Sequence, residues 1–445
     1  MSREVWSARR FRATKGSPVK VLILTLGTRG DVQPFIALAH ELRQRGHEAI
    51  VAAPQRFAGL AAAHGVPFSA LDDGPLRVLD DGSGVEDVAR GGFRGKVALM
   101  RRMPAMFGRV LDDCWQVADT GAGAGADVVV HNGQVIAGQH VAEKLGVPAV
   151  LGLPLPMYVP TREFPWPGQD VSDRLPGWLN RITYAGMRAP ALMFGHTVDR
   201  WRDLLGLPRR RGRHDPALRP DGGPAPVLHA ISPAVLPRPA DWPATAQVTG
   251  YWFTPPAPST GGLLDVQVRA LLDSRPAPVF VGFGSMAGPD PATASRTVLE
   301  ALDLVGLPGI VAGGWGGLQS FASDRHAFVA GDVPHEVVFP RCAVIVHHGG
   351  AGTTAAAARA GVPQVICPFV ADQPFWGRRM HRLGVAPPPV PQTRLDALAL
   401  AAAIRQATRD AGMAEAARLL GERIRAENGA AATVDALERI TGTHR

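Results

Sequence analysis

The chain alternates short runs of consecutive apolar residues with segments in which apolar positions recur every three or four residues. Val21–Leu24 forms such a run, and Phe35, Leu38 and Leu42 then recur at helical spacing until Gly46. An uninterrupted apolar run is typical of a strand buried on both faces, whereas the longer spacing is typical of a helix that packs against it. The alternation therefore predicts parallel sheets covered by helices on both faces.

The predicted strands fall into two groups. The first group is Val19–Gly27, Ala49–Ala53, Asp127–His131, Pro148–Leu153, Val227–Ile231 and Gln247–Thr249. The second group is Pro278–Ser285, Gly309–Ala312, Phe328–Val329, Ala343–His347 and Gln364–Pro368. Further helices are predicted over Tyr184–Met193, Val198–Leu205, Ala292–Leu304, Thr353–Ala360, Asp372–Leu383 and along the Ala-rich tail, Leu395–Ile440. Two doubly wound sheets facing each other predict a cleft that can bind two substrates at the carboxyl ends of the strands.

The domain organisation follows from this pattern and from the length. A chain of 445 residues exceeds what one core usually supports. The segment Thr254–Gly262 between the two groups is mostly Pro, Ser, Thr and Gly, as in a linker. We expect a flexible basic arm over residues 1–17, a first domain over 18–250, a linker over 251–263, a second domain over 264–425 and a final helical segment over 426–445.

Composition narrows the class of protein. The three cysteines, Cys114, Cys342 and Cys367, are far apart and form no C-x-x-C pair. A disulfide framework or a zinc site is therefore not expected, and a reducing cytoplasm is the predicted location. The basic first 17 residues lack the apolar stretch of a secretory signal, and no run of about 18 apolar residues predicts a membrane span.

The formal charge of +8 comes almost entirely from arginine. The densest run, Arg209–Arg213, lies among Pro and Gly and is interpreted as a solvated loop rather than a phosphate-binding patch. Aromatic residues do not interleave with it, so the stacking surface of a nucleic-acid binder is missing. No nucleic-acid partner is expected.

The strongest signal for a ligand is a glycine-rich turn between a predicted strand and a predicted helix. Its residues are His347, His348, Gly349, Gly350, Ala351, Gly352, Thr353 and Thr354. The glycines let the backbone approach a ligand closely, and the helix start offers unpaired N–H groups that suit a diphosphate. His348 can donate to a phosphate oxygen as negative charge develops. The alternative is a tight turn with a Thr cap and buried histidines, and the spacing matches neither a dinucleotide fingerprint nor a P-loop.

A second turn follows the first predicted strand. It consists of Gly27, Thr28, Arg29, Gly30 and Asp31. At the carboxyl end of a central strand, the Asp31 carboxylate faces the cleft and can remove a proton from an acceptor hydroxyl. The alternative is that Asp31 only caps the next helix; the two roles are compatible because a carboxylate has two oxygens.

Two further positions carry polar candidates. Asp372 and Gln373 begin a predicted helix and can bind vicinal sugar hydroxyls, although they could equally be ordinary helix-start residues. Ser285 ends a predicted strand beside Gly284 and can contact a diphosphate or simply form a turn.

These motifs together resemble the family 1 glycosyltransferases, in particular the branch of bacterial natural-product and sterol glucosyltransferases. The resemblance rests on the glycine-rich turn, on Asp372–Gly377, on Gly282–Met286, on Pro334–Glu336 and on Gly27–Pro34, which occur in the expected order. It covers most of the chain.

The resemblance implies the GT-B fold, with two Rossmann-like domains and the nucleotide sugar mainly on the second. It implies that Asp31 is the base, that Asp372 and Gln373 hold the donor sugar, and that Val333 and His335 line the nucleotide base. It also implies that the first domain binds the acceptor and that a final helix packs back on that domain.

The resemblance further implies an inverting transfer of a hexose from UDP-glucose or a dTDP-sugar to a lipophilic acceptor such as a sterol, macrolide, polyketide or glycolipid. No D-x-D triplet occurs, so neither a metal nor another cofactor is expected. Methionines and aromatic residues of the irregular parts of the first domain suit such an acceptor, or fill the core: Met100, Met103, Met106, Phe107, Trp115, Met157, Tyr158, Phe164, Trp166 and Met193.

Two other functions stay open at this stage. A sugar-nucleotide epimerase can share the fold and needs no acceptor pocket. A non-catalytic nucleotide-sugar-binding helper can also share it, although such a protein has no chemical need for the whole set of Asp31, His348, Asp372 and Gln373. A monomer or homodimer with possible peripheral membrane contact is expected.

Overall fold

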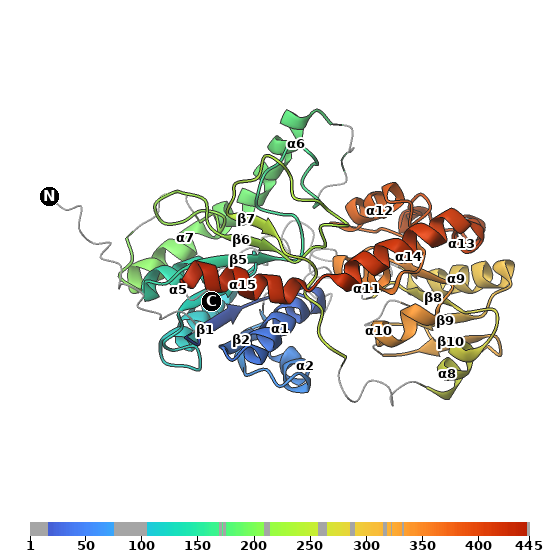
Figure 1. The fold of residues 1–445 in the computed structure, drawn as a ribbon, viewed down its shortest axis with the longest axis horizontal. Helices are drawn as coiled ribbons and strands as arrows, with labels where there is room; N and C mark the ends of the chain where they lie inside the picture. Colours follow the sequence, from blue (N-terminus) through green and yellow to red (C-terminus); the bar gives the residue numbers. More distant parts are fainter. Residues whose placement is uncertain are drawn as a thin grey trace.

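The structure, a computed structural model, consists of two α/β domains, each built on one parallel sheet (Figure 1). It describes residues 17–74, 105–168, 171, 175–208, 214–256, 265–284, 290–314, 318–321, 323–331 and 333–442. Ser285, most of the predicted arm and residues 257–263 of the predicted linker lie outside the described residues. The predicted fold class of two doubly wound parallel sheets is confirmed.

The first domain holds a seven-stranded sheet in the order β3-β2-β1-β4-β5-β6-β7. Its strands are β1 Lys20–Leu24, β2 Glu48–Pro54, β3 Phe68–Leu71, β4 Val128–His131, β5 Ala149–Leu153, β6 Val227–His229 and β7 Ala246–Val248. β1 lies between β2 and β4, with Leu22 opposite both Ile50 and Val129. The sequence pattern missed β3 because only Leu71 of this edge strand is buried, so it lacks an apolar run.

The second domain holds a five-stranded sheet in the order β10-β9-β8-β11-β12. Its strands are β8 Val279–Gly282, β9 Gly309–Ala312, β10 His326–Val329, β11 Val344–His347 and β12 Gln364–Ile366. β8 lies at the centre and pairs in parallel with β11, Val281 opposite Val346. The carboxyl ends of β8 and β11 therefore meet at one edge of the sheet.

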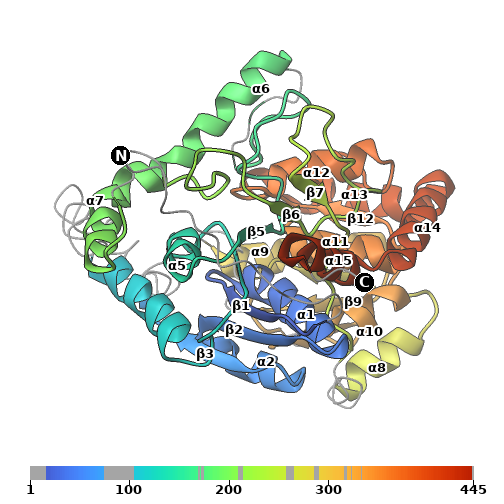
Figure 2. The same ribbon diagram turned by 60° about the vertical axis from the view of Figure 1, so that its left-hand side comes forward.

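Helices cover both sheets. Those of the first domain are α1 Arg29–Gln44, α2 Ala58–Ala63, a helix over 105–119, α5 Gly138–Leu145, α6 Gly177–Thr183 and α7 Ala189–Leu204, with short 3-10 turns η1 Gln55–Phe57 and η2 Tyr184–Arg188. α6 projects away from the sheet (Figure 2), whereas the second half of α7 packs on it, with Val198 and Trp201 buried in one cluster with Leu22 of β1. α7 continues through Gly195, where the sequence predicts a break, because Phe194 and Val198 are buried one turn apart.

The helices of the second domain are α8 Val266–Asp273, α9 Pro291–Val305, α10 His335–Val338, α11 Ala351–Ala360, α12 Gln373–Arg382, α13 Ala397–Arg409 and α14 Ala411–Ala426, with η4 Phe339–Arg341 and η5 Gln392–Arg394. The Ala-rich tail is thus three helices, the last being α15 Gly429–Thr441. No helix among the described residues is both long and apolar enough to cross a lipid bilayer.

The last helix packs on the first domain. Val434 and Leu437 of α15 are buried in the same core as Phe35 and Ile36 of α1. Two polar contacts fix the helix at its outer side: Arg45 Nη1 lies 2.5 Å from Asp435 Oδ1, and His47 Nε2 lies 3.0 Å from Glu438 Oε1. Figure 1 shows α15 crossing from the second domain onto α1 and β5. The tail therefore contributes to the core of the domain in which the described chain begins.

The two domains also share direct contacts. Arg379 Nε of α12 donates to the carbonyl oxygen of Val235 at 2.6 Å. Gln33 Nε2 of α1 donates to Oγ1 of Thr254, in the segment that joins the domains, at 2.9 Å. A buried apolar cluster continues from β5 and β6 into α12, where the Phe164 and Phe375 rings are 5.6 Å apart. These contacts hold the carboxyl edges of the two sheets toward each other.

Candidate active site

The first residues of α1 and α11 face each other where the two domains meet (Figure 1). The Cα of Gly30 lies 4.0 Å from the position that a Cβ on Gly352 would occupy. Each helix begins shortly after a central strand of its sheet, α1 after β1 and α11 after β11. Two helix N-termini at this separation place two positive dipole ends on one small region, which favours a bound anion.

Asp31 lies in the first turn of α1 and is half-buried. Its Oδ2 accepts hydrogen bonds from the backbone N–H of Thr28 at 2.8 Å and from Thr28 Oγ1 at 3.0 Å. The capping role considered for Asp31 is thus present, and it engages one of the two carboxylate oxygens. Gly27 is required beside it, because a Cβ there would lie 2.3 Å from Asp31 Oδ2 and the φ of Gly27 is +124°.

The electrostatics of Asp31 suit a base. Burial raises the pKa of its carboxyl above the usual value, while hydrogen bonds from Thr28 and from the side chain of Gln134 oppose this rise. A carboxylate with a raised pKa accepts a proton more readily than an exposed aspartate does.

The glycine-rich turn leaves backbone donors open. Gly350 precedes α11 in extended conformation, and Gly349 has a φ of +92°. No partner is found for the backbone N–H groups of Gly352 and Thr353 within the part of the chain that the structure describes. The hydroxyl of Thr354 is buried and likewise has no partner among the described residues. These groups are the donors that a diphosphate would need.

The two adjacent histidines have different roles. His347 is fully buried; its Nδ1 accepts from the N–H of Gly349 at 3.0 Å and its Nε2 lies 2.8 Å from Gln364 Oε1. Burial lowers the pKa of His347 to about 3, so this ring is a neutral support for the turn. The alternative of a buried structural histidine therefore holds for His347.

His348 lies against the turn instead of beneath it. A Cβ on Gly350 would lie 2.5 Å from His348 Nε2, so the glycine makes room for the ring. Burial lowers the pKa of His348 to about 4, and a hydrogen bond to the backbone of Gly282 opposes this fall. Its Nδ1 has no hydrogen-bond partner in the described part of the chain. Nδ1 is therefore the ring nitrogen left for a further hydrogen bond, and it lies on the side of the ring away from Gly350.

Asp372 approaches the site from the second domain. It is half-buried immediately before α12, and its Oδ2 accepts from Trp376 Nε1 at 2.8 Å. Burial raises the pKa of Asp372 to about 6, the charge of Asp31 adds to the rise, and hydrogen bonds from Trp376 and Ala351 oppose it. The charges of the two carboxylates predicted from the sequence thus influence each other across the domain boundary.

Gln373, the partner of Asp372 in the predicted sugar site, is almost fully buried. Only 3% of it is exposed, and its Oε1 accepts from the N–H groups of Phe369 at 2.7 Å and Val370 at 3.2 Å. The loop before it contains Ala371 with a φ of +57°, a strained value for a residue with a side chain. The side-chain carbonyl of Gln373 therefore stabilises the conformation of the loop that carries Asp372.

The remaining predicted residues that the structure describes lie on both domains. The His335 ring stacks on Phe339 at a centroid distance of 4.2 Å, and Val333 is half-buried against the same apolar cluster. Arg29 is exposed at the start of α1, where its Nε donates to Gln33 Oε1 at 2.9 Å. The structure thus brings together the turns of both domains and Asp372.

Sequence reasoning missed a third loop at this site, residues 132–135 after β4. Asn132 is buried, and Gln134 reaches Asp31. The available signal was the Asn132-Gly133 pair directly after a predicted strand, which marks a turn at the carboxyl edge of the sheet.

The expectation about apolar acceptor residues is partly wrong. Met106, Phe107 and Trp115 lie on the helix over 105–119, not in irregular structure, and Met106 packs in the core. Met193 lies on α7, where it is 58% exposed, and Met100 and Met103 lie outside the described residues. Met157, Tyr158 and Trp166 are half-buried in the loops after β5 and remain candidates.

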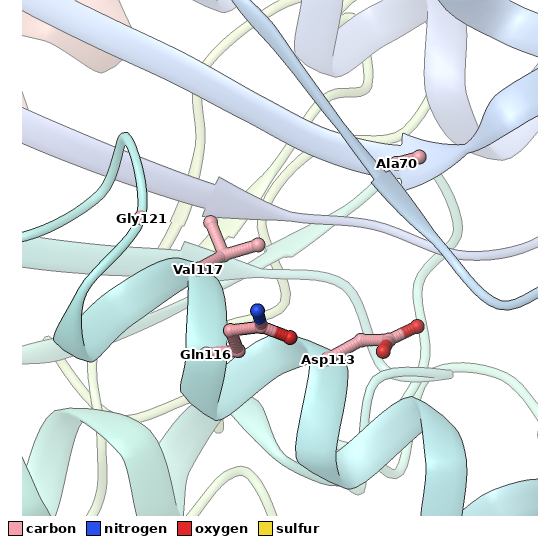
Figure 3. A pocket seen from close by; sticks show the side chains of 5 residues that line it. All are labelled: Ala70, Asp113, Gln116, Val117 and Gly121. Atoms are coloured by element: carbon pink, nitrogen blue, oxygen red, sulfur yellow. The ribbon is translucent and has the colours of Figure 1, made fainter.

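A shallow hollow elsewhere in the first domain does not belong to this site. It is lined by Ala70, Asp113, Gln116, Val117 and Gly121 (Figure 3). The hollow lies between β3 and the helix over 105–119, and it contains none of the residues at the two helix N-termini. No group of three or more His, Cys, Asp or Glu that could hold a metal occurs among the described residues.

Comparisons with known proteins agree with this architecture. Residues 21–161 match the glycosyltransferase family 28 N-terminal domain, and residues 326–440 match the erythromycin biosynthesis protein CIII-like C-terminal domain. The chain is 36% identical over 428 residues to O-mycaminosyltylonolide 6-deoxyallosyltransferase of Streptomyces fradiae, a match that covers 92% of this chain and 95% of that protein.

A plant protein and a solved structure are also similar. The chain is 33% identical over 429 residues to a sterol 3-beta-glucosyltransferase of Arabidopsis thaliana, which covers 95% of this chain and 68% of that protein. The crystal structure of the glycosyltransferase of kitacinnamycin superposes with a TM-score of 0.70 at 18% identity, covering 96% of this chain and 100% of the other. The chain therefore belongs to the family 1 glycosyltransferases, which are sugar-nucleotide-dependent enzymes of the GT-B fold.

Proposed function

We propose that this enzyme transfers a hexose from UDP-glucose or a dTDP-sugar to a hydroxyl group of a lipophilic small molecule, with inversion at the anomeric carbon. The observation that carries the proposal is the meeting of two helix N-termini with one carboxylate from each domain. Open backbone donors on α11 suit the diphosphate, and Asp31 on α1 lies across from them.

In the proposed reaction, Asp31 acts on the acceptor. Thr28 holds Oδ2, and the other oxygen takes the proton of the attacking hydroxyl. The acceptor oxygen forms a bond to the anomeric carbon while the bond from that carbon to the diphosphate oxygen breaks. A single displacement from the opposite side inverts the configuration.

The leaving diphosphate is stabilised from the second domain. Its charge is matched by the N–H groups of Gly352 and Thr353 and by His348 Nδ1. A bound dianion raises the pKa of His348 from its value of about 4, so the ring can carry protons on both nitrogens in the complex. One nitrogen then donates to Gly282 and the other to the diphosphate. These groups supply positive charge without a metal ion.

Asp372 is proposed to bind hydroxyls of the transferred sugar. Its carboxylate lies close enough to Asp31 for the two charges to interact, which is where a sugar between acceptor and diphosphate must lie. Gln373 supports it by fixing the loop over 369–372.

The acceptor class is proposed from the relatives and from the loops after β5. One relative is named for a macrolide acceptor and another for a sterol. Half-buried Met157, Tyr158 and Trp166 offer an apolar and adaptable wall for a molecule of that kind.

The test is a donor and acceptor panel. UDP-glucose, dTDP-glucose, UDP and dTDP are first ranked by the rise in Tm that each causes. The donor that binds is then incubated with cholesterol and with a macrolide aglycone, and glycosylated products are sought by mass spectrometry. An isomerised nucleotide sugar in the absence of acceptor would support an epimerase instead, and binding without hydrolysis or transfer would support a helper protein.

A further inference from the structure

The loop after β5 contains a strained turn that core packing alone does not require. Tyr158 has a φ of +63°, although it is not glycine. The N–H of Val159 donates to the carbonyl oxygen of Met157 at 2.8 Å, which closes a three-residue turn around Tyr158. Turns of this hand are rare and strained, and a non-glycine residue in such a region persists only where its surroundings fix it. Here Trp242 Nε1 donates to the carbonyl oxygen of Val159 at 3.0 Å.

The strained turn directs Tyr158 onto the loop after β4. The Tyr158 hydroxyl donates to the carbonyl oxygen of Gly133 at 2.8 Å. The Tyr158 ring also fills the space beside Gly133, where a Cβ would lie 2.3 Å from Cε2. Residue 133 is therefore held from one side by both a hydrogen bond and ring packing.

Asn132 holds the same loop from the opposite side. Its Nδ2 donates to the carbonyl oxygen of Leu26 at 2.6 Å, and its Oδ1 accepts from the N–H groups of Gln134 and Val135, both at 3.1 Å. Leu26 directly precedes the turn that carries Asp31, so Asn132 ties the ends of β1 and β4 together. The loop over 132–135 is thus fixed between Leu26 and Tyr158.

The residue presented by this fixed loop is Gln134. Its side chain lies near enough to the Asp31 carboxylate to lower the pKa of that group, and Oδ2 of the carboxylate is already held by Thr28. We infer that Gln134 is a positioning residue that orients the second oxygen of Asp31 toward the acceptor hydroxyl, and that Tyr158 holds Gln134 in place. This inference rests on the proposed function of Asp31 as base.

A glutamine amide suits this task because it donates without adding charge. Asp31 already faces the carboxylate of Asp372 from the second domain, and Arg29 is the cation on its own helix. A second acid at position 134 would oppose ionisation of Asp31, and a cation would hold the carboxylate too tightly to accept a proton. A neutral donor fixes the orientation while leaving the carboxylate basic.

The first experiment measures Asp31 directly and needs no substrate. Aspartate carboxyl carbons are labelled with ¹³C, the Asp31 resonance is assigned by its loss in Asp31→Asn, and its pKa is followed by NMR. Gln134→Ala is expected to raise the Asp31 pKa by about half a unit, because a donor to the charged form is lost. Gln134→Glu is expected to raise it by about one unit or more. The exposed Gln116 of the hollow in Figure 3 provides the matched control, Gln116→Ala, with no change.

The second experiment measures turnover of UDP-glucose or dTDP-glucose, whichever raises Tm, with release of the nucleoside diphosphate as the signal. Gln134→Ala is expected to lower kcat about tenfold with the KM for donor unchanged, since orientation of the base is lost and the diphosphate site is intact. Tyr158→Phe is expected to have a smaller effect in the same direction. Tyr184→Phe is its control, because the buried Tyr184 hydroxyl has no partner among the described residues.

The outcomes separate the two proposals. An Asp31 pKa that is equal in wild type, Gln134→Ala and Gln134→Glu would overturn the role of Gln134, whatever the activity. A changed Asp31 pKa together with full turnover of Asp31→Asn would leave the contact intact and refute the base. A rise in the KM for donor in Gln134→Ala without a fall in kcat would also contradict positioning, because it would place Gln134 in the donor site.

Discussion

The turn before α1 and the turn before α11 occupy equivalent places in the two domains, yet they treat the start of the helix in opposite ways. Both follow a central strand and both contain glycines that make room for a polar side chain. In the first, Asp31 occupies the helix start and accepts from Thr28. In the second, the N–H groups of Gly352 and Thr353 have no partner among the described residues. The domain that supplies its own anion presents the carboxylate that we propose as the base, and the domain that leaves its donors open presents the turn that we propose for the diphosphate.

The largest effect is expected from Asp31→Asn. The amide oxygen still accepts from Thr28, so the helix start is retained, but the side chain no longer takes a proton. We expect kcat to fall about a thousandfold, within the range attributed to a positioned base, with donor affinity unchanged. Steady-state kinetics and the Tm shift with donor measure the two quantities. Near-full turnover with unchanged donor binding would show that the first turn only caps its helix.

The next largest effect is expected from His348→Ala in the second turn. Loss of one donor to the leaving diphosphate should lower kcat about a hundredfold. Burial lowers the pKa of His348 to about 4 in the ligand-free protein, and we propose that the ring takes up a proton in the complex, so UDP affinity should rise as pH falls from 8 to 6. The variant should lose this dependence, measured by calorimetry. His196→Ala, an exposed histidine on α7, is the control; an unaltered pH dependence in His348→Ala would refute the assignment.

A smaller effect, on stability rather than on kcat, is expected from Asp372→Asn. This variant tests the carboxylate of the second domain as Asp31→Asn tests that of the first. The folded state raises the pKa of Asp372 from 3.8 to about 6, so it binds this proton more tightly than the unfolded chain does. Protonated Asp372 therefore contributes to the free energy of unfolding at low pH, and this contribution is lost as pH rises from about 4 to 6. Removing the charge should stabilise the ligand-free protein by about 1–2 kcal/mol at pH 8 and leave it unchanged at pH 3.5. Urea midpoints at the two pH values test this, and equal midpoints of variant and wild type at pH 8 would contradict it.

The smallest effect is expected from a pair of glycine substitutions at the two helix starts. Gly352→Ala places a methyl group beside the open N–H groups of α11, whereas Gly30→Ala places one at the start of α1. Neither new Cβ lies closer than 3.8 Å to a neighbour, so both variants should fold. Gly352→Ala should weaken UDP binding about fivefold, equal to about 1 kcal/mol, and Gly30→Ala should not. Equal weakening by both would place the diphosphate between the turns instead of on α11.

Local sequence patterns predicted the two glycine-containing turns of the site, but not the loop over 132–135 or the turn at Tyr158. The turn at His347–Thr354 and the turn at Gly27–Asp31 were predictable because glycines, a strand and a helix lie together in the chain. Gln134 was not, because its approach to Asp31 depends on β4 lying next to β1, a pairing between residues about a hundred positions apart. The strained turn at Tyr158 was hidden for another reason: its sequence contains neither the glycine nor the asparagine that usually signals a positive φ.

Other differences have equally physical causes. The separate functions of His347 and His348 depend on which ring faces Gln364, and adjacent residues of one type carry no such information. Gln373 matched a sugar-binding position, but its carbonyl oxygen accepts from the backbone of its own loop. The helix over 105–119 follows residues outside the described part of the chain and was overlooked in a region rich in Gly and Asp.

The path of the chain between the domains limits how this enzyme can be re-engineered. The chain leaves the first domain after Trp252, whose ring packs on Phe35 at a centroid distance of 5.4 Å. It returns at Gly429, which lies so close to Gly250 that a Cβ on Gly429 would be 2.3 Å from the backbone of Gly250. The second domain is thus inserted into the first. Both ends of the described chain, β1 and α15, lie in the first domain. A chimera that exchanges donor preference should graft only the segment between Trp252 and Gly429 and keep Trp252 and α15 with the recipient, since a simple C-terminal swap would replace part of the recipient's own core.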